Sequence, residues 1–445
     1  MGPACPHPLT LIDFLPGFSS SAEENEVNCL NLNIWTPPLD ERPKEGWPVM
    51  VWIHGGAYID GANSLPIYDG TNLAKKYPVI VVVINYRLNV FGFLASQELV
   101  DDSEDGSAGN YGLLDQRLAF EWVKENISHF GGDNTRICAF GESAGSTSIA
   151  HHLVISKGLF QRAILESGAV DTLPSVSIEK KQIIFDEICK RLSITGDDKV
   201  AKLRAISAEK LLGAIENLSV GTKFLWTGTI DGVTIKQSPR LLYQDPDNID
   251  PAVKEIIIGE NTDEGSLFAN VFPPKETVSA TLRSEFSPLQ AEAIKQLYPC
   301  EELDGLVTLG KIYGDQLFSG PIREVARALA DSKDPSRRVY SYRFNAPMEK
   351  TAKFNLGVHH LQEIYFVFNQ HIHLNEMEQK VSEKMSQFWV NFASTGVPDE
   401  GWEPFQTKCE TSLVFEPNGI IKRKIDDDEV RDRRLLFWKS FQEES

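Results

Sequence analysis

The chain has 445 residues, of which 42% are hydrophobic and 24% are charged, which is the composition of a globular protein with material for a large core. Its formal net charge of −19 argues against nucleic acid and anionic membrane surfaces as partners, because their phosphates would be repelled. No apolar run approaches the roughly 20 residues that span a bilayer. No secretory signal is visible at the N-terminus, which favours a cytoplasmic location, with secretion left open if the N-terminus is incomplete.

Strands and helices are expected to alternate from about residue 47 onward. Continuous apolar runs predict buried strands, and helical spacing predicts a helix over 113–127 with Leu114, Leu118, Trp122 and Val123 on one side. The expected strands are 47–53, 79–85, 135–140, 163–165, 255–258 and 339–342. A helix follows at 144–154, and residues 175–215 are mostly helical and could form a cap region. This alternation predicts a mainly parallel sheet flanked by helices, and the lack of a linker predicts a single domain over residues 1–445.

One short motif has the setting of a catalytic serine. Ser143 is the centre of Gly141-Glu142-Ser143-Ala144-Gly145, which follows a predicted strand directly and opens a predicted helix. A GxSxG pentad alone is weak evidence, but strand, turn and helix together are the context of a nucleophile elbow. A serine hydroxyl needs a base to remove its proton, so the motif requires a His, an acid and donors for an oxyanion.

A glycine loop upstream is a candidate for those donors. His54-Gly55-Gly56-Ala57 follows the strand over 47–53, as an HGGG-type oxyanion loop does. Ala57 stands at the third glycine position and still carries an N–H. The elbow and this loop together predict the α/β-hydrolase fold.

The acid and the base are less clearly marked by position. Asp263 and Glu264 both follow the predicted strand over 255–258, where active-site loops of α/β sheets occur. His359 and His360 lie together between a polar loop and an apolar helix, whereas His371 and His373 are interpreted as solvated surface residues. The residues alone leave both pairs open.

The chain resembles the type-B carboxylesterases, which include the cholinesterases and the bacterial p-nitrobenzyl esterases. The resemblance covers nearly the whole chain and is carried by an ordered series of segments. They are Cys29-Leu30-Asn31-Leu32-Asn33-Ile34, Val51-Trp52-Ile53-His54-Gly55-Gly56, Asn110-Tyr111-Gly112-Leu113-Leu114-Asp115-Gln116, the elbow, Leu165-Glu166-Ser167-Gly168, Asp263-Glu264-Gly265 and Arg434-Leu435-Leu436-Phe437-Trp438.

The resemblance implies a role for each matching residue. It implies Ser143 as nucleophile, Glu264 as acid and His360 as base, the last because the family's His lies three residues before the Glu matched by Glu363. It also implies Ser167 as a residue near the triad. The implied oxyanion donors are the N–H groups of Gly56, Ala57 and Ala144, and the implied disulfide joins Cys5 to Cys29.

Two departures from the family pattern bear on structure and substrate. The first strands of the pattern are missing, so the chain is expected to be either an N-terminally shortened member of the family or a partial sequence of one. The loop between Cys5 and Cys29 contains no Trp, and such a Trp holds the quaternary ammonium in cholinesterases, so choline-ester specificity is not implied.

The expected function is a serine esterase that hydrolyses small carboxylic esters through an acyl-enzyme, without a metal or cofactor. Phe224 and Trp226 are candidates for the acyl pocket, although aromatic residues there could equally be core. The alternatives are a non-catalytic adhesion or scaffold protein of the same fold and a lipase acting on longer esters. The sequence specifies neither the natural ester nor the oligomeric state.

Overall fold

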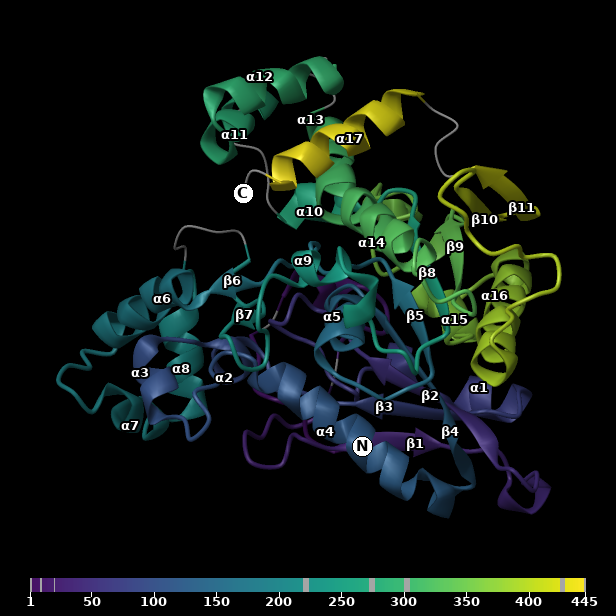
Figure 1. Ribbon diagram of the computed structural model, residues 1–445, viewed down its shortest axis with the longest axis horizontal. Coiled ribbons are helices and arrows are strands. Elements are labelled where there is room, and N and C mark those ends of the chain that lie inside the picture. Colours follow the sequence, from purple (N-terminus) through teal and green to yellow (C-terminus); the bar gives the residue numbers. More distant parts are fainter. Residues whose placement is uncertain are drawn as a thin grey trace. The chain divides into compact units, whose positions relative to one another are not determined.

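The computed structural model describes residues 2–8, 10–19, 21–218, 224–271, 277–299, 305–424 and 429–443. Two compact units emerge from the contacts within the chain. The first contains Met1–Ile164 and Leu173–Lys254, and the second contains Leu165–Thr172 and Glu255–Ser445. Figure 1 shows the elements of both along the chain.

The first unit is built on a mostly parallel sheet. Its strands follow the order β1-β3-β2-β4, in which only the β1–β3 pair is antiparallel. Every residue of β2 and β3 is buried, which explains why both strands are continuous apolar runs in the sequence. The strands are β1 (Leu32–Trp35), β2 (Trp47–Ile53), β3 (Ile80–Ile84) and β4 (Gly132–Glu142), and β5 (Arg162–Glu166) carries residues of both units.

Helices accompany these strands, and a group of them forms the helical region expected over 175–215. In that group α3 contacts α6 and α7, and α8 contacts α6. A short parallel pair, β6 (Val176–Ser177) with β7 (Thr229–Ile230), borders it. The helices of the unit are α1 (Thr71–Lys76), α2 (Asn89–Phe93), α3 (Gln97–Asp102), α4 (Tyr111–Asn126), α5 (Ala144–Ile155), α6 (Ile178–Arg191), α7 (Lys199–Arg204), α8 (Ala208–Ile215) and α9 (Pro239–Tyr243).

The buried side of α4 differs from the one that its spacing suggested. The helix itself is confirmed, but Leu118 is 61% exposed and Trp122 is 37% exposed. The buried positions include Leu113, Phe120 and Val123. The prediction of a single apolar side through Leu118 and Trp122 was therefore wrong, because apolar residues on this helix face both the core and the solvent.

Helix α5 approaches β2 closely enough to require glycine. A Cβ atom on Gly145 would lie 1.9 Å from the carbonyl oxygen of Ile53, and one on Gly141 would lie 2.6 Å from the same oxygen. Both distances are far inside van der Waals contact with backbone, which cannot move aside as a flexible side chain can. The two glycines of the pentad therefore allow α5 to pack against β2.

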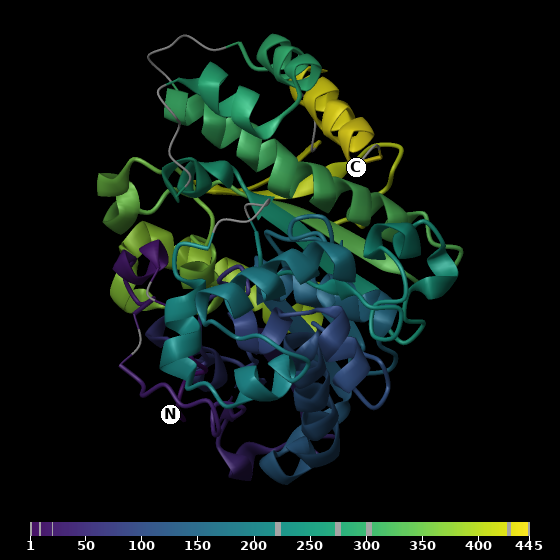
Figure 2. The same ribbon diagram turned by 90° about the vertical axis from the view of Figure 1, so that its left-hand side faces the viewer.

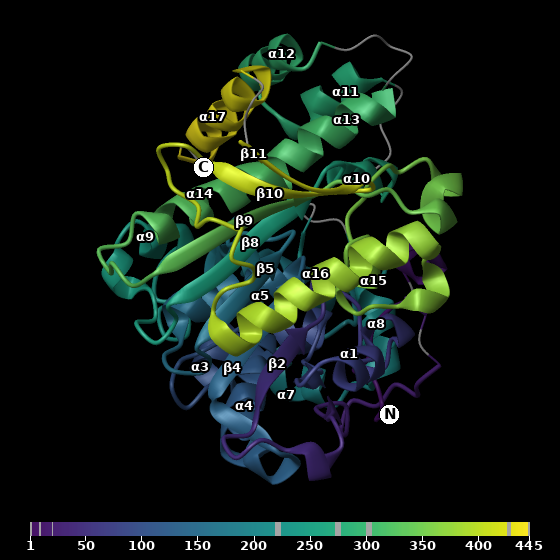
Figure 3. The same ribbon diagram turned by 90° about the vertical axis from the view of Figure 1, so that its right-hand side faces the viewer.

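The second unit has its own mostly parallel strands. Their order is β8-β9-β10-β11, with parallel pairs except for the terminal β10–β11 hairpin. Helix α14 lies along one side of β8 and β9, and α16 lies on the other side, next to β10 (Figure 3). The elements are β8 (Glu255–Asn261), β9 (Arg338–Phe344), β10 (Thr411–Glu416), β11 (Gly419–Lys424), α14 (Gly320–Ala330), α15 (Ile364–Val367) and α16 (Glu376–Thr395).

A separate helical core lies beside these strands within the second unit. Figure 2 shows the C-terminal helix α17 (Glu429–Glu443), in yellow, beside green helices from the middle of the chain. They are α10 (Gly265–Val271), α11 (Val278–Glu285), α12 (Pro288–Leu297) and α13 (Gly305–Gly314). Trp438 of α17 is fully buried in this core, and its indole N–H donates to the Tyr298 hydroxyl at 2.8 Å.

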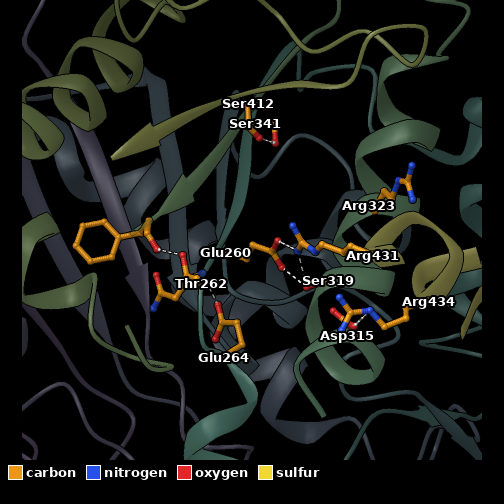
Figure 4. Close-up of polar contacts among 12 residues, drawn as sticks. Glu260, Thr262, Glu264, Asp315, Ser319, Arg323, Ser341, Ser412, Arg431 and Arg434 are labelled. Carbon is orange, nitrogen blue, oxygen red and sulfur yellow. Dashed lines mark hydrogen bonds and ion pairs between the residues drawn. The ribbon is translucent and has the colours of Figure 1, made fainter. Parts of the chain in front are cut away.

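Buried ion pairs fasten α17 to the strands of its unit. Arg431 donates to Glu260 on β8 and, at 3.0 Å, to the Ser319 hydroxyl, which itself donates to Glu260 at 2.5 Å. Arg323 on α14 binds Asp432 of α17 at 2.6 Å. Figure 4 shows Glu260 directed at Arg431 and Ser319, with Glu264 further along the chain and apart from that cluster.

The expected strands and the expected helices at 113–127 and 144–154 are thus all present, and the mainly parallel arrangement is confirmed. The single-domain reading of residues 1–445 stays a prediction.

We expect Gly145→Ala to destabilise the protein, because its methyl group would overlap the Ile53 carbonyl. Overpacking of this kind costs about 1–3 kcal/mol or more. The matched control is Gly213→Ala in α8, where a Cβ meets nothing within 4 Å and the change should stabilise the helix by up to about 1 kcal/mol. Urea unfolding of both variants measures the difference, and equal stability of the two would contradict the packing account.

Candidate active site

Ser143 lies in a strained turn between β4 and α5. Its backbone has φ 57° and ψ −118°, and the residue is 6% exposed. The Thr147 N–H donates to the Ser143 carbonyl at 2.8 Å, so the helix starts immediately after the serine. A non-glycine residue in such a conformation costs about 1–3 kcal/mol and is kept where the surrounding structure enforces it. This is the geometry that a nucleophile elbow requires.

The loop after β2 has three consecutive residues with positive φ. They are Gly56 at 101°, Ala57 at 52° and Tyr58 at 61°. The chain therefore turns sharply where the oxyanion loop was predicted. Gly55 lies close to the elbow, because a Cβ atom built on it would lie 3.1 Å from the Cβ of Ser143. Loop and elbow thus belong to one local structure within the first unit.

Aromatic side chains pack against the loop over residues 54–58. The His54 ring stacks on Tyr86 with centroids 4.4 Å apart, and the Tyr86 hydroxyl donates to the His54 carbonyl at 2.8 Å. Tyr58 packs on Phe93 and shares a hydrogen bond of 3.1 Å with the Ser148 hydroxyl on α5. Sequence reasoning assigned no role to Tyr58 or Tyr86.

In the second unit, His360 pairs with Glu264. His360 Nδ1 lies 2.6 Å from Glu264 Oε2, and both side chains are buried. The backbone N–H of Asn261 donates to Glu264 Oε1 at 2.7 Å. Asp263 accepts instead from the Val358 backbone N–H at 2.8 Å. The structure therefore brings Glu264, and not Asp263, to the histidine.

Apolar surroundings control the protonation of this pair. The His360 ring lies 5.2 Å from the Phe268 ring and 4.7 Å from the Phe318 ring, measured between centroids. Burial lowers the pKa of His360 and raises the pKa of Glu264, because each charged form loses its hydration, and their contact at 2.6 Å opposes both shifts. His360 is accordingly uncharged near neutral pH and can accept a proton.

A second buried carboxylate, Glu363, lies next to the pair. The Ser167 hydroxyl donates to Glu363 Oε1 at 2.8 Å, and the Asn261 side chain donates to its other oxygen. Burial, and then the nearby charge of Glu264, raise the pKa of Glu363 to about 7. Asn261 thus binds both carboxyl groups, Glu264 through its backbone N–H and Glu363 through its side-chain amide. Sequence reasoning used Glu363 only to locate His360 and assigned it no role.

The predicted site residues are divided between the two units. Gly56, Ala57, Ser143 and Ala144 belong to the first unit, and Ser167, Glu264 and His360 belong to the second. His359 is buried, with its Nδ1 2.5 Å from the His360 carbonyl oxygen. His371 is exposed and His373 is partly exposed. Cys5 and Cys29 form a disulfide bond in the first unit.

The segment that carries Phe224 and Trp226 rests on a buried lysine. Lys181 on α6 is fully buried, and its ammonium donates to the carbonyls of Leu225 and Thr227 at 2.8 and 2.9 Å. These carbonyls flank Trp226, whose side chain is buried. Burial lowers the pKa of Lys181 to about 7. The acyl-pocket role of Phe224 and Trp226 stays a prediction, and no sequence signal marked Lys181.

Within the described parts of the chain, no helix is both long enough and apolar enough to cross a membrane. The same residues contain no group of three or more His, Cys, Asp or Glu side chains arranged to hold a metal ion.

A serine in a strained turn between a parallel strand and a helix, with a glycine loop beside it, defines an α/β-hydrolase. The comparison with solved structures agrees. Two structures of PNB esterase match with TM-scores of 0.79 and 0.81 at 31% sequence identity, covering 98% of this chain and 88% of theirs.

The comparisons of sequence specify the family. The profile described as Carboxylesterase family matches residues 1–432. Para-nitrobenzyl esterase of Bacillus subtilis is 33% identical over 98% of this chain and 87% of its own length. Acetylcholinesterase of Leptinotarsa decemlineata is 32% identical over 96% and 75%, and bile salt-activated lipase of Mus musculus is 31% identical over 93% and 74%. The chain belongs to the carboxylesterase family and is a carboxylic-ester hydrolase.

The buried ammonium of Lys181 predicts a pH dependence of stability. Its folded pKa of about 7 lies below the unfolded value, so the unfolded chain binds more protons between pH 7 and 10 and stability rises with pH across that window. Lys181→Met should flatten this rise by up to about 4 kcal/mol. The control is the exposed neighbour, Lys180→Met. Urea unfolding at several pH values tests this, and a Lys181→Met slope equal to that of the control would rule it out.

Proposed function

We propose that the protein hydrolyses small carboxylic esters through an acyl-enzyme, with Ser143, His360 and Glu264 as the catalytic triad. The single observation that carries the proposal is the buried His360–Glu264 pair, in which the acid holds Nδ1 at 2.6 Å. With Nδ1 held, Nε2 is the nitrogen that takes the proton from Ser143. The strained turn at Ser143 supports its assignment as nucleophile.

The reaction follows the order of a two-step acyl transfer. His360 removes the Ser143 proton as the hydroxyl oxygen attacks the ester carbonyl carbon, and the negative charge develops on the carbonyl oxygen. The N–H groups of Gly56, Ala57 and Ala144 stabilise that oxyanion, and each such donor is worth about 3 kcal/mol. His360 then gives its proton to the leaving alcohol. Water, activated by the same histidine, releases the acid and regenerates Ser143.

Glu264 orients the imidazole and stabilises the imidazolium that forms during each step. Its charge would be costly in so buried a place without the Asn261 N–H and the imidazole on its two oxygens. The relatives named for para-nitrobenzyl esters support small nitroaromatic esters as test substrates.

Ser143→Ala should lower the hydrolysis of p-nitrophenyl butyrate by at least about a thousandfold, because the acyl-enzyme can no longer form. The control is Ser156→Ala, at the other end of α5 and buried to a similar extent, which should keep most of the activity. Circular dichroism checks that both variants are folded. Substantial turnover by folded Ser143→Ala would reject the proposed nucleophile.

The pH profile should report the environment of His360. The base must be unprotonated, so kcat/KM falls as the pH drops through the pKa of His360 in the free enzyme. Burial lowers that pKa below its ordinary value of 6.5, so we expect the acid limb of kcat/KM to lie below pH 6.5. Initial rates from pH 4 to 7, with far-UV circular dichroism at each pH, measure it. A limb at or above 6.5 in folded protein would count against this base.

A further inference from the structure

A buried aspartate, Asp60, lies between the oxyanion loop and the disulfide loop, defined as residues 5–29. Asp60 is 4% exposed. The Thr10 hydroxyl, from the disulfide loop, donates to Asp60 Oδ2. The other oxygen, Oδ1, has no hydrogen-bond partner among the residues that the structure describes. An isolated buried carboxylate oxygen is costly when charged, so this arrangement needs an explanation.

Asp60 Oδ1 lies against Gly56. A Cβ atom built on Gly56 would lie 2.4 Å from Oδ1 and 2.3 Å from the Asp60 carbonyl oxygen, so both oxygens occupy the space that a side chain at position 56 would need. The N–H groups of Ile59 and Asp60 both point back to the Gly56 carbonyl, at 2.8 and 3.2 Å. The carboxyl group is therefore folded over the backbone of a predicted oxyanion donor.

The disulfide loop closes over the same place. The Asn89 side chain donates to the carbonyls of Pro6 in that loop and Ile59 in the oxyanion loop, at 3.1 and 3.3 Å. A cavity of about 60 Å³ lies between the two loops, and Asp60 lines it together with residues of the disulfide loop. The titratable groups that face Asp60 are His7, Asp13 and Glu24 of the disulfide loop and His54 and Tyr86 on its own side.

The charge of Asp60 affects catalysis in the proposed mechanism, because a negative oxyanion develops close to it. An oxyanion held by the Gly56 and Ala57 N–H groups is negative, and an ionised carboxylate against Gly56 would oppose it at short range in a poorly hydrated place. A protonated carboxyl keeps the same shape and the same contact with Thr10 without that repulsion.

We propose that Asp60 is a positioning residue of the oxyanion loop, which supports catalysis when protonated and weakens it when ionised. This inference rests on the proposed function, because it presupposes the oxyanion donors. Burial raises the pKa of Asp60 to about 7, which brings the change into the neutral range. The bond from Thr10 and the charge of His7 act in the opposite direction, and the charge of Asp13 adds to the rise. Asp60 thus makes the reaction sensitive to pH near neutrality, in addition to the acid limb of His360.

The test is the pH profile of kcat for p-nitrophenyl butyrate from pH 5.5 to 9.5. Product is measured by chromatography, so that the titration of p-nitrophenol does not interfere. In the unaltered protein, kcat should fall several-fold to a lower plateau as the pH rises through about 7. Asp60→Asn, which has the same shape and no charge, should lack this step and exceed the unaltered protein at pH 8.5.

A second variant tests the direction in which the pH step moves. The Thr10 bond stabilises the ionised form of Asp60, so Thr10→Val should move the step to higher pH. This variant also serves if Asp60→Asn does not fold. An unchanged profile in both folded variants would overturn the inference. Residual activity of Ser143→Ala would instead reject the proposed function, so the two failures can be told apart.

Discussion

The contact on which the first unit depends is the approach of α5 to β2 at Gly145. Only an atom as small as hydrogen fits between that helix and the Ile53 carbonyl, so helix and strand lie at minimal separation. Because the strand leads directly into the glycine loop and the helix begins directly after Ser143, this one approach brings the loop and the elbow together. Ser143, Gly56 and Ala57, all with positive φ, adjoin this contact at the ends of β4 and β2.

The second unit differs from the first in that it buries a group of ionisable side chains. Glu264, Glu363 and His360 are almost completely removed from water, and their hydrogen-bonding atoms are shared through Asn261 and Ser167. Burial disfavours every charged form here, so each charge in the group needs a hydrogen-bond partner close to it. In the proposed mechanism the imidazolium appears only while Ser143 or water is attacking, and Glu264 is in place to stabilise it. The ion pair of Arg431 on α17 with Glu260 secures the strand that leads to this acid.

Much of this architecture follows from local pattern. The buried strands could be predicted because apolar β-branched runs suit strands covered on both faces, and the elbow because strand, pentad and helix adjoin. The choice between Asp263 and Glu264 could not be made from the residues, since both stand in one polar loop, and it needed the resemblance; the geometry then pairs Glu264 with His360. The prediction that Leu118 and Trp122 of α4 face the core was wrong, because apolar residues lie on more than one side of that helix and their spacing does not identify the buried side. Asp60 and Lys181 gave no signal, because burial of an ionisable group arises from packing between distant segments.

The central claim is that one serine, made nucleophilic by His360, carries the reaction. Diethyl p-nitrophenyl phosphate tests it most directly, because it leaves a stable phosphoryl group on an activated serine where an ester would leave a transient acyl group. Mass spectrometry of the intact and digested protein should show one diethylphosphoryl group, on the peptide that contains Ser143, and labelling should be strongly slowed in His360→Gln. Labelling of a different serine, or equal labelling rates with and without His360, would contradict the account.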